Sequence, residues 1–243
     1  MNKNTKFGVI GFGEFGKLVI DKLLPTESKI FVNDKNKSLN LKSNIKFDDL
    51  RTVCSANVII LAVPFDAYID LLPKIAKLIN KDTLVVDVCS VKIEPHELFK
   101  INGLFNRNNI LMTHPLFGPQ SSVNGVADMD IVITKQSGEL SRQLINFWQS
   151  IGLKTTHLSA DKHDFEMARV HALTSFVGRT LLNMDIKDSS VPTNYFIQLL
   201  SLIDVEQHHS KKLFETIQRH NPYARDIRKK FIEAAISLDK SIQ

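Results

Sequence analysis

Three glycines spaced as Gly-x-Gly-x-x-Gly follow a short apolar segment and precede a helical pattern, at positions Gly11, Gly13 and Gly16. The first glycine allows a tight turn, the second lets a pyrophosphate approach the backbone, and the third lets the helix pack on the strand. The N-terminus of that helix would offer unpaired N–H groups to the phosphates. A glycine turn that serves only the fold is the alternative interpretation. We predict dinucleotide contacts from six residues of the turn: Gly11, Phe12, Gly13, Glu14, Phe15 and Gly16.

A carboxylate after the second apolar segment bears on which dinucleotide binds. Asp34 lies 23 residues after the first glycine, where an acidic residue can hydrogen-bond to the 2′-hydroxyl of the ribose. Its charge would repel a 2′-phosphate, so we predict NAD as the cofactor. Lys35 and Lys37 keep NADP open as the alternative. The segment that ends at Val63 and Pro64 would supply the loop beside the nicotinamide ribose.

Two later segments carry side chains suited to proton transfer, and each follows an apolar run. Ligands of open α/β sheets bind beyond the carboxyl ends of the strands. His114 follows the run 110–113, and a histidine with an ordinary pKa of about 6.5 can take a proton from a substrate hydroxyl. Ser90, one strand end away, could orient that imidazole or bind the same hydroxyl. A His-Pro pair after a strand is often structural, but a neighbouring dinucleotide site favours catalysis.

A polar stripe runs along a long helical pattern in the last third of the chain. Its members are seven, four and four positions apart and so share one helix face: Asp164, His171, Ser175 and Arg179. Such a stripe is usually solvated surface. Because this helix must pack on the first domain, the stripe could instead face a cleft. We predict substrate contacts from His171, Ser175 and Arg179, and from Gln120 in the earlier loop.

These side chains require a framework of alternating strands and helices. Short apolar runs predict buried parallel strands at 6–10, 29–33, 58–63, 84–87 and 110–113. Helical spacing predicts helices at 15–24, 68–79 and 93–100. A further strand, helix and strand are expected at 131–134, 140–150 and 153–158. The alternation is typical of a Rossmann-type, doubly wound α/β sheet.

The pattern changes after residue 158. One long helix is predicted over 160–184, and helical spacing continues over 194–210 and 211–237 with a break near Asn221-Pro222. We therefore expect a dinucleotide-binding domain at 1–158 and a smaller, all-helical domain at 159–243.

Composition bounds the class of protein. Apolar residues make up 43% and charged residues 23%, as in soluble globular proteins. The longest apolar run, the eight residues 58–65, is far shorter than the roughly 20 that span a bilayer, so no membrane partner is expected. The polar N-terminus and the two isolated cysteines, Cys54 and Cys89, favour a cytoplasmic location.

Charge and histidine placement argue against two kinds of partner. The net charge of +5 is spread evenly, without a basic stripe, so no nucleic acid is expected. The pair His208-His209 lacks a ligand set at metal spacing, so no metal site is predicted.

Five short motifs are spread over nearly the whole chain. They are Gly11–Gly16, Asp87–Lys92, His114–Ser121, His163-Asp164 followed by Gly178-Arg179, and Asn221–Ala224. In this order they resemble the prephenate/arogenate dehydrogenase family, and the layout is most similar to its arogenate-type members. The resemblance implies a dinucleotide domain followed by a helical domain that forms a dimer interface, so a homodimer is expected.

The resemblance also implies a reaction on a small-molecule substrate. That reaction is the oxidative decarboxylation of a cyclohexadienol, arogenate or prephenate, in tyrosine biosynthesis. His114 would deprotonate the C4 hydroxyl as general base while hydride passes to the nicotinamide, and Ser90 would hold the hydroxyl or the imidazole. Loss of CO2 would restore aromaticity.

Two departures from the family pattern bear on the substrate. Some prephenate-using members carry an arginine in the segment that matches Asp204–Ser210, where this chain has Val205 and no arginine. Many arogenate-type members carry a histidine at the position of Ser175, although His171 lies one turn earlier. The missing arginine favours arogenate, but Arg179 or Arg169 could substitute for it.

Two other functions are consistent with the sequence. A related two-domain reductase of imines or keto acids is one, although such enzymes usually place a lysine or an acid where this helix offers His171 and Ser175. A catalytically silent, dinucleotide-binding regulator is the other, because the Ser175 and Val205 positions are altered.

Overall fold

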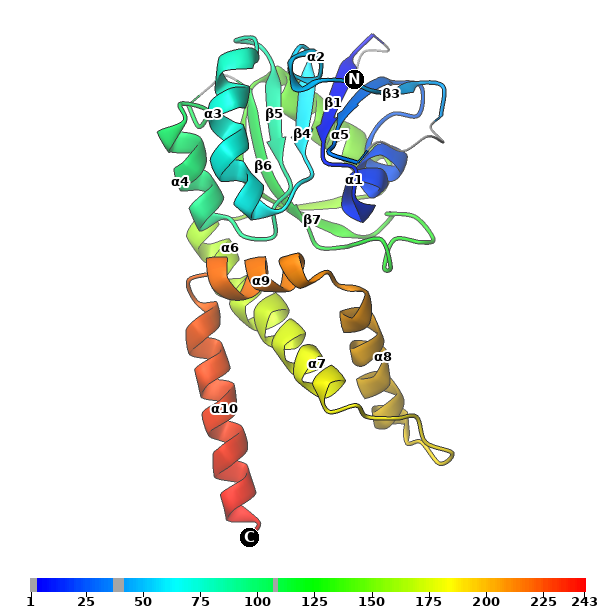
Figure 1. Ribbon diagram of the computed structural model, residues 1–243, viewed down its shortest axis with the longest axis vertical. Helices are drawn as coiled ribbons and strands as arrows, with labels where there is room; N and C mark the ends of the chain where they lie inside the picture. The colour runs from blue at the N-terminus through cyan, green and yellow to red at the C-terminus, as the bar shows by residue number, and fades with distance from the viewer. Residues whose placement is uncertain (1–3, 37–41, 107–108) are drawn as a thin grey trace. The chain divides into compact units, whose positions relative to one another are not determined.

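The computed structural model describes residues 4–36, 42–106 and 109–243, so Lys37 lies outside the described residues (Figure 1). The chain divides into two compact units, residues 1–160 (unit 1) and 161–243 (unit 2). The sequence placed the end of the first domain at residue 158. Each unit is described by itself.

Unit 1 is built on one eight-stranded sheet. The strands are β1 (Lys6–Ile10), β2 (Lys29–Asn33), β3 (Ile45–Phe47), β4 (Val58–Leu61), β5 (Leu84–Asp87), β6 (Ile110–Pro115), β7 (Asp130–Ser137) and β8 (Lys154–His157). Their order in the sheet is β3-β2-β1-β4-β5-β6-β7-β8, and neighbours are parallel except β6 and β7. The strand order reverses between β1 and β4, which is where ligands bind in sheets of this type.

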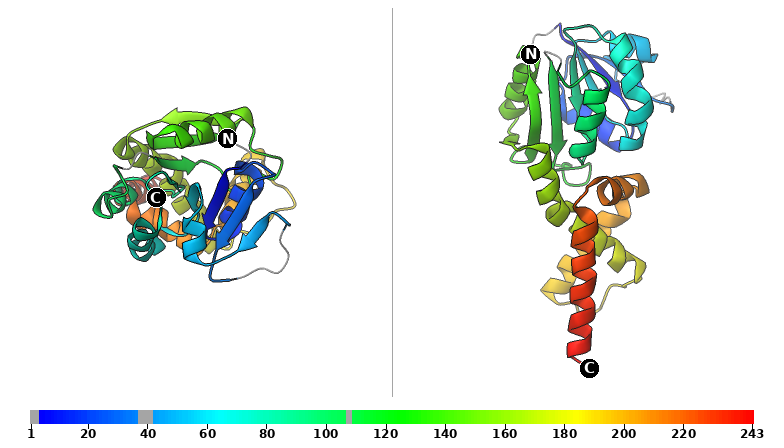
Figure 2. Two further views of the ribbon diagram at one scale, coloured as in Figure 1. Left: turned by 90° about the horizontal axis from the view of Figure 1, so that it is seen from above. Right: turned by 90° about the vertical axis from the view of Figure 1, so that its left-hand side faces the viewer.

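Helices cover both faces of this sheet (Figure 1, Figure 2). They are α1 (Glu14–Leu18), its π-helical continuation η1 (Val19–Leu23), α2 (Leu50–Cys54), η2 (Phe65–Ala67), α3 (Tyr68–Leu78), α4 (Ile93–Ile101) and α5 (Glu139–Ser150). Alternate residues of the central strands β1, β2, β4, β5 and β6 enter two separate cores, so Val58 and Ile60 pack with α1 and α5, while Ile59 and Leu61 pack with α2, α3 and α4. Burial on both faces explains why these central strands are apolar runs without alternation.

Unit 2 consists of helices. They are α6 (Ala160–Met167, which begins at the last residue of unit 1), η3 (Ala168–Leu173), α7 (Thr174–Asn183), α8 (Asn194–His208), α9 (Lys211–His220) and α10 (Ala224–Ser241). The helix predicted over 160–184 is continuous, but η3 is a π-helical segment within it. A Cβ atom on Gly178 would lie 2.6 Å from Cγ of Glu206, so this glycine lets α8 approach α7 closely.

The fold class predicted from the sequence is confirmed, and the differences are local. The strand β3 and the helix α2 were not predicted because three and five residues are too few for a periodic signal. The strand predicted to end at residue 113 extends to Pro115, because antiparallel pairing with β7 continues through that residue. No helix in the described part of the chain is long and apolar enough to cross a membrane.

Candidate functional site

The glycine turn between β1 and α1 combines two crowded positions with an open one. Gly11 has a φ of +100°, and a Cβ atom there would lie 2.2 Å from the carbonyl oxygen of Ala62. A Cβ atom on Gly16 would lie 2.2 Å from the carbonyl oxygen of Gly11. A Cβ atom on Gly13 would meet no heavy atom within 4 Å. The chain thus leaves space at Gly13, in front of the N-terminus of α1, that a phosphate group would fill.

Asp34, which directly follows β2, is hydrogen-bonded to the glycine turn. One carboxylate oxygen accepts a hydrogen bond of 2.6 Å from the backbone N–H of Phe12, and the other accepts one of 2.7 Å from the N–H of Asn36. The Phe12 ring packs edge-to-face against Phe47 of β3, with ring centroids 5.2 Å apart. A negative charge is therefore fixed beside the turn, at the position where a ribose hydroxyl binds in such folds.

The other predicted cofactor residues surround the same turn. Val63 follows β4, and its Cγ1 atom would lie 2.8 Å from a Cβ atom on Gly11, so the two residues are adjacent. Pro64 is exposed and precedes η2. Glu14 is exposed and pairs with Lys17 at 2.7 Å, so its N–H rather than its carboxylate is the group available to a phosphate.

Ser90 and His114 lie near the carboxyl ends of the parallel strands β5 and β6. Ser90 is half-buried, three residues after β5. His114 was predicted to follow a strand, but it lies inside β6, opposite Val132 of β7 and only 4% exposed. Because β1, β4, β5 and β6 run in one direction, both residues stand at the same edge of the sheet as the glycine turn. Gln120 is exposed in the loop that follows.

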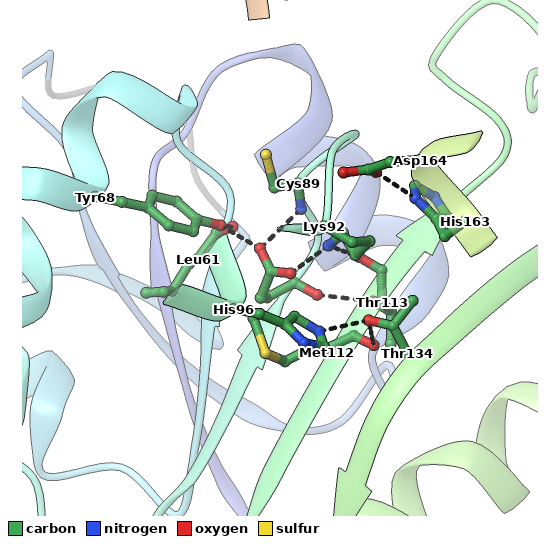
Figure 3. A network of polar contacts seen from close by, with 11 residues as sticks. Leu61, Tyr68, Cys89, Lys92, His96, Met112, Thr113, Thr134, His163 and Asp164 are labelled. Atoms are coloured by element: carbon green, nitrogen blue, oxygen red, sulfur yellow. Dashed lines mark hydrogen bonds and ion pairs between the residues drawn. The ribbon is translucent and has the colours of Figure 1, made fainter. Parts of the chain in front are cut away.

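A buried polar network connects the ends of β4, β5 and β6 (Figure 3). The Asp87 carboxylate accepts hydrogen bonds from the Tyr68 hydroxyl at 2.7 Å and the Cys89 N–H at 3.0 Å, and it forms an ion pair with Lys92. The Lys92 ammonium also donates to the carbonyl of Thr113 at 2.5 Å. Burial, reinforced by the negative charge of Asp87, raises the pKa of Tyr68 well above its ordinary value, so the phenol stays protonated as a donor.

The sequence marks Asp87–Lys92 as a motif, but it predicts no role for the side chains of Asp87 and Lys92. One local signal exists, because a charged residue closes the otherwise apolar strand 84–87. The contacts with Tyr68 and Thr113 carry no such signal, since these residues lie 19 and 26 positions from Asp87.

Unit 2 contains a cluster of charged and polar side chains from η3, α7 and the C-terminal end of α8. We call it the Arg179–Glu206 cluster, and its members are His171, Ser175, Arg179, Glu206 and His209. The Arg179 guanidinium lies 3.5 Å from the carboxylate of Glu206 and donates to the His209 carbonyl at 3.1 Å. Glu206 is only 2% exposed, and its other oxygen lies 3.1 Å from Nδ1 of His209. Asp164, predicted to share the stripe, instead contacts the adjacent His163 at 2.8 Å.

Three buried polar atoms of this cluster make no hydrogen bond to the described residues. Among the described residues, Oγ of Ser175, Nε of Arg179 and Oε2 of Glu206 are buried without a hydrogen-bond partner. Within the described part of the chain, Oε2 of Glu206 keeps only the 3.5 Å ion pair with Arg179. A buried polar group without a hydrogen bond costs about 1–3 kcal/mol, so polar ligands or waters would be favoured there. Burial lowers the pKa of His171 to about 4, with a smaller effect from His209, so its imidazole is neutral at pH 7.

Glu206 was missed by the sequence analysis, because an acid within an apolar helical pattern has no partner until α7 and α8 are placed together. As for metals, the described residues include no group of three or more His, Cys, Asp or Glu side chains that could hold an ion.

The sequence of the chain resembles a known family and known proteins. A model described as the prephenate dehydrogenase nucleotide-binding domain matches residues 22–155. Arogenate dehydrogenase 2, chloroplastic, of Arabidopsis thaliana is 28% identical over 235 residues, which is 90% of this chain and 64% of that protein. A probable arogenate/prephenate dehydrogenase of Methanocaldococcus jannaschii is 24% identical over 223 residues, 86% of this chain and 49% of that protein. The chain thus spans less than two thirds of the length of these curated relatives.

Solved structures share the fold, among them two dehydrogenases. Prephenate dehydrogenase from A. aeolicus, in complex with hydroxyphenyl propionate and NAD+, has a TM-score of 0.75 at 18% identity, covering 98% of this chain and 90% of that one. Synechocystis arogenate dehydrogenase has a TM-score of 0.66 at 16% identity, covering 98% of this chain and 93% of that one. At these identities the likeness establishes the architecture alone.

Proposed function

The chain belongs to the prephenate dehydrogenase family, and we propose from this premise that it is an NAD-dependent oxidoreductase that oxidatively decarboxylates arogenate or prephenate in tyrosine biosynthesis. One observation carries the proposal. The glycine turn, Ser90 and His114 stand at the same edge of one sheet. Ser90 and His114 lie within residues 22–155, which match the family's nucleotide-binding domain, and the glycine turn directly precedes that segment. The names of the relatives support the same substrate class.

The glycine turn and Asp34 support NAD as the cofactor. The space at Gly13 and the N-terminus of α1 would receive the pyrophosphate, and the fixed carboxylate of Asp34 would bind the ribose and disfavour a 2′-phosphate. Exposed Lys35 keeps NADP as the alternative. The A. aeolicus relative, whose structure contains NAD+, is consistent with this preference. When bound, the nicotinamide would supply the acceptor for the hydride.

His114 is the proposed general base and Ser90 its partner in catalysis. The imidazole would take the proton of the ring hydroxyl as the C–H bond at the same carbon breaks. The Ser90 hydroxyl would orient either that hydroxyl or the imidazole. The ring then loses CO2 and becomes aromatic, which makes the overall step favourable. General-base assistance of this kind is worth roughly 10²–10⁴ in rate.

The Arg179–Glu206 cluster favours arogenate over prephenate as the substrate. Because Glu206 offsets the charge of Arg179, this arginine does not present an uncompensated positive charge to the carboxylate of a keto-acid side chain. Arg169, the other arginine that could have served, is paired with Glu166 at 2.6 Å. A zwitterionic amino-acid side chain carries both charges and so matches a neutral pair of opposite charges. The proposed substrate contacts remain His171, Ser175, Arg179 and Gln120.

We further propose that the protein is a homodimer formed through unit 2. The helix α10 exposes the apolar side chains of Ile232, Ile236 and Leu238, which are 45%, 51% and 64% accessible. Exposed apolar surface of this kind marks an interaction site in soluble proteins, and closed symmetric dimers are the commonest assembly. Light scattering should give twice the chain mass, and Ile236→Asp should shift it toward the monomer. The cytoplasmic location stays a prediction.

The test is a steady-state assay at 340 nm with arogenate and prephenate, each with NAD and NADP. We expect NAD-dependent reduction with arogenate, and an at least hundredfold lower kcat for His114→Asn with an unchanged Kd for NAD. Full activity of this variant would rule out His114 as the base. Oxidation of NADH by imines or keto acids would favour the reductase alternative. NAD binding without turnover of either substrate would favour the silent regulator.

A further inference from the structure

The ion pair between Asp87 and Lys92 is wholly buried inside unit 1. Both side chains are 0% exposed, whereas the described ion pair on the neighbouring helix, Lys100 with Glu97, is about half-exposed at both ends. Lys92 directly precedes α4, yet its side chain turns inward to Asp87 and Thr113 (Figure 3). Lysine side chains ordinarily keep their ammonium in water.

The network built on this pair reaches the two proposed catalytic residues through their chain neighbours. The Cys89 N–H, which donates to the Asp87 carboxylate, belongs to the residue before Ser90. The Thr113 carbonyl, which accepts from Lys92, belongs to the residue before His114. The Thr113 hydroxyl also donates to the Asp87 carbonyl at 2.8 Å, so β5 and β6 are tied together at this point.

Stability alone is a weak reason for such a pair. Removing two charges from water costs several kcal/mol for each ion, and apolar replacements of similar volume are often as stable or more stable. A pair with additional hydrogen bonds does, however, fix geometry, because each donor and acceptor has one satisfied arrangement. Lys92 cannot touch a substrate because it is completely buried.

We propose that Lys92 is a positioning residue for the reaction. Its ammonium bridges the Thr113 carbonyl and the Asp87 carboxylate, because it donates a hydrogen bond to each. This bridge sets the separation between the backbones of Ser90 and His114. The role in turnover rests on the proposed function, whereas the role in holding the two strand ends together does not.

The test compares a single with a double substitution. Lys92→Met leaves the Asp87 carboxylate buried without its counter-charge, so we expect a Tm lower by roughly 10 °C. Asp87→Asn combined with Lys92→Met removes both charges and keeps acceptors for Tyr68 and Cys89, so the Tm should return to within about 3 °C of the wild type. Its kcat should nevertheless stay at least about tenfold lower, with an unchanged Kd for NAD, because the strand ends are no longer held.

Two measurements complete the design. Lys100→Met, which breaks an exposed ion pair on α4, the helix that Lys92 precedes, is the matched control and should change neither Tm nor kcat. Hydrogen exchange, which needs no substrate, should rise in the double variant over segments 87–92 and 110–116 and stay unchanged elsewhere.

The outcomes separate the two proposals. A folded double variant with wild-type kcat and wild-type exchange would overturn the positioning role, and so would a double variant that fails to fold, because the pair would then be needed for folding itself. A wild-type protein without turnover would overturn the proposed function, and the exchange result alone would then decide whether Lys92 holds the strand ends.

Discussion

A matched pair of alanine substitutions in the glycine turn separates binding from folding. Gly13 and Gly16 lie three residues apart, and in each case the change adds one methyl group. The structure assigns opposite surroundings to the two methyl groups: no heavy atom within 4 Å at Gly13, and the Gly11 carbonyl oxygen at 2.2 Å at Gly16. We therefore expect Gly13→Ala to impair cofactor binding and Gly16→Ala to impair the fold.

The effect of Gly13→Ala on stability should be neutral or slightly favourable. Gly13 has φ −69° and ψ −173°, which alanine adopts without strain. Replacing glycine at such a position stabilises proteins by about 0.4–1 kcal/mol through the unfolded chain. In a chain of this size the Tm should then rise by roughly 1–4 °C. The new methyl group would, however, occupy the space proposed for the pyrophosphate, so the Kd for NAD should rise at least about tenfold, or ~1.4 kcal/mol.

The effect of Gly16→Ala should be the reverse. Its methyl group would meet backbone atoms, which cannot move aside as a flexible side chain would. Overpacking of this kind costs about 1–3 kcal/mol, so the Tm should fall by roughly 2–12 °C.

Calorimetric titration with NAD and a thermal melt of both variants provide the assay. An unchanged Kd for NAD in Gly13→Ala would refute the assignment of the open space to the cofactor. A Tm loss in Gly13→Ala as large as that in Gly16→Ala would refute the claim that the two positions have different roles.

Three further predictions concern charges. Asp34→Asn keeps an acceptor for the Phe12 N–H but removes the charge, so titrations should show the ratio of affinities shifting toward NADP by about tenfold or more; an unchanged ratio would exclude Asp34 as the discriminating residue. Glu206→Gln leaves Arg179 without its offsetting charge, so the ratio of kcat/KM for prephenate to that for arogenate should rise by about tenfold, and a fall would contradict the charge-matching argument. His171 has a pKa of about 4 in the folded protein, so between pH 6.5 and 4 only the unfolded chain takes up its proton. The free energy of unfolding should therefore decrease as the pH falls through that window, by at most about 1.4 kcal/mol per pH unit, and His171→Gln should flatten this dependence in denaturant titrations.

The sequence by itself determined the features that rest on local pattern. The glycine spacing, Asp34 and the apolar runs indicated the Rossmann-type sheet and the dinucleotide turn. Turn geometry and strand burial depend on the types of residues that are adjacent in sequence. The edge of the sheet that carries Ser90 and His114 followed as well, since parallel strands share one carboxyl end.

Only the tertiary structure decided which charges are buried and what they meet. Asp87 meets Lys92, Tyr68 and Thr113 inside unit 1, and Glu206 meets Arg179 in unit 2. Antiparallel pairing with β7 likewise placed His114 inside a strand. The contacts of Asp87 with Tyr68 and Thr113 join segments from distant parts of the chain, whereas the pair with Lys92 forms between residues only five positions apart because that lysine turns inward. A charged residue at the end of an apolar run is a local signal, but the free energy of a charge depends on its surroundings in three dimensions, so the sequence pattern does not show which groups each charge contacts.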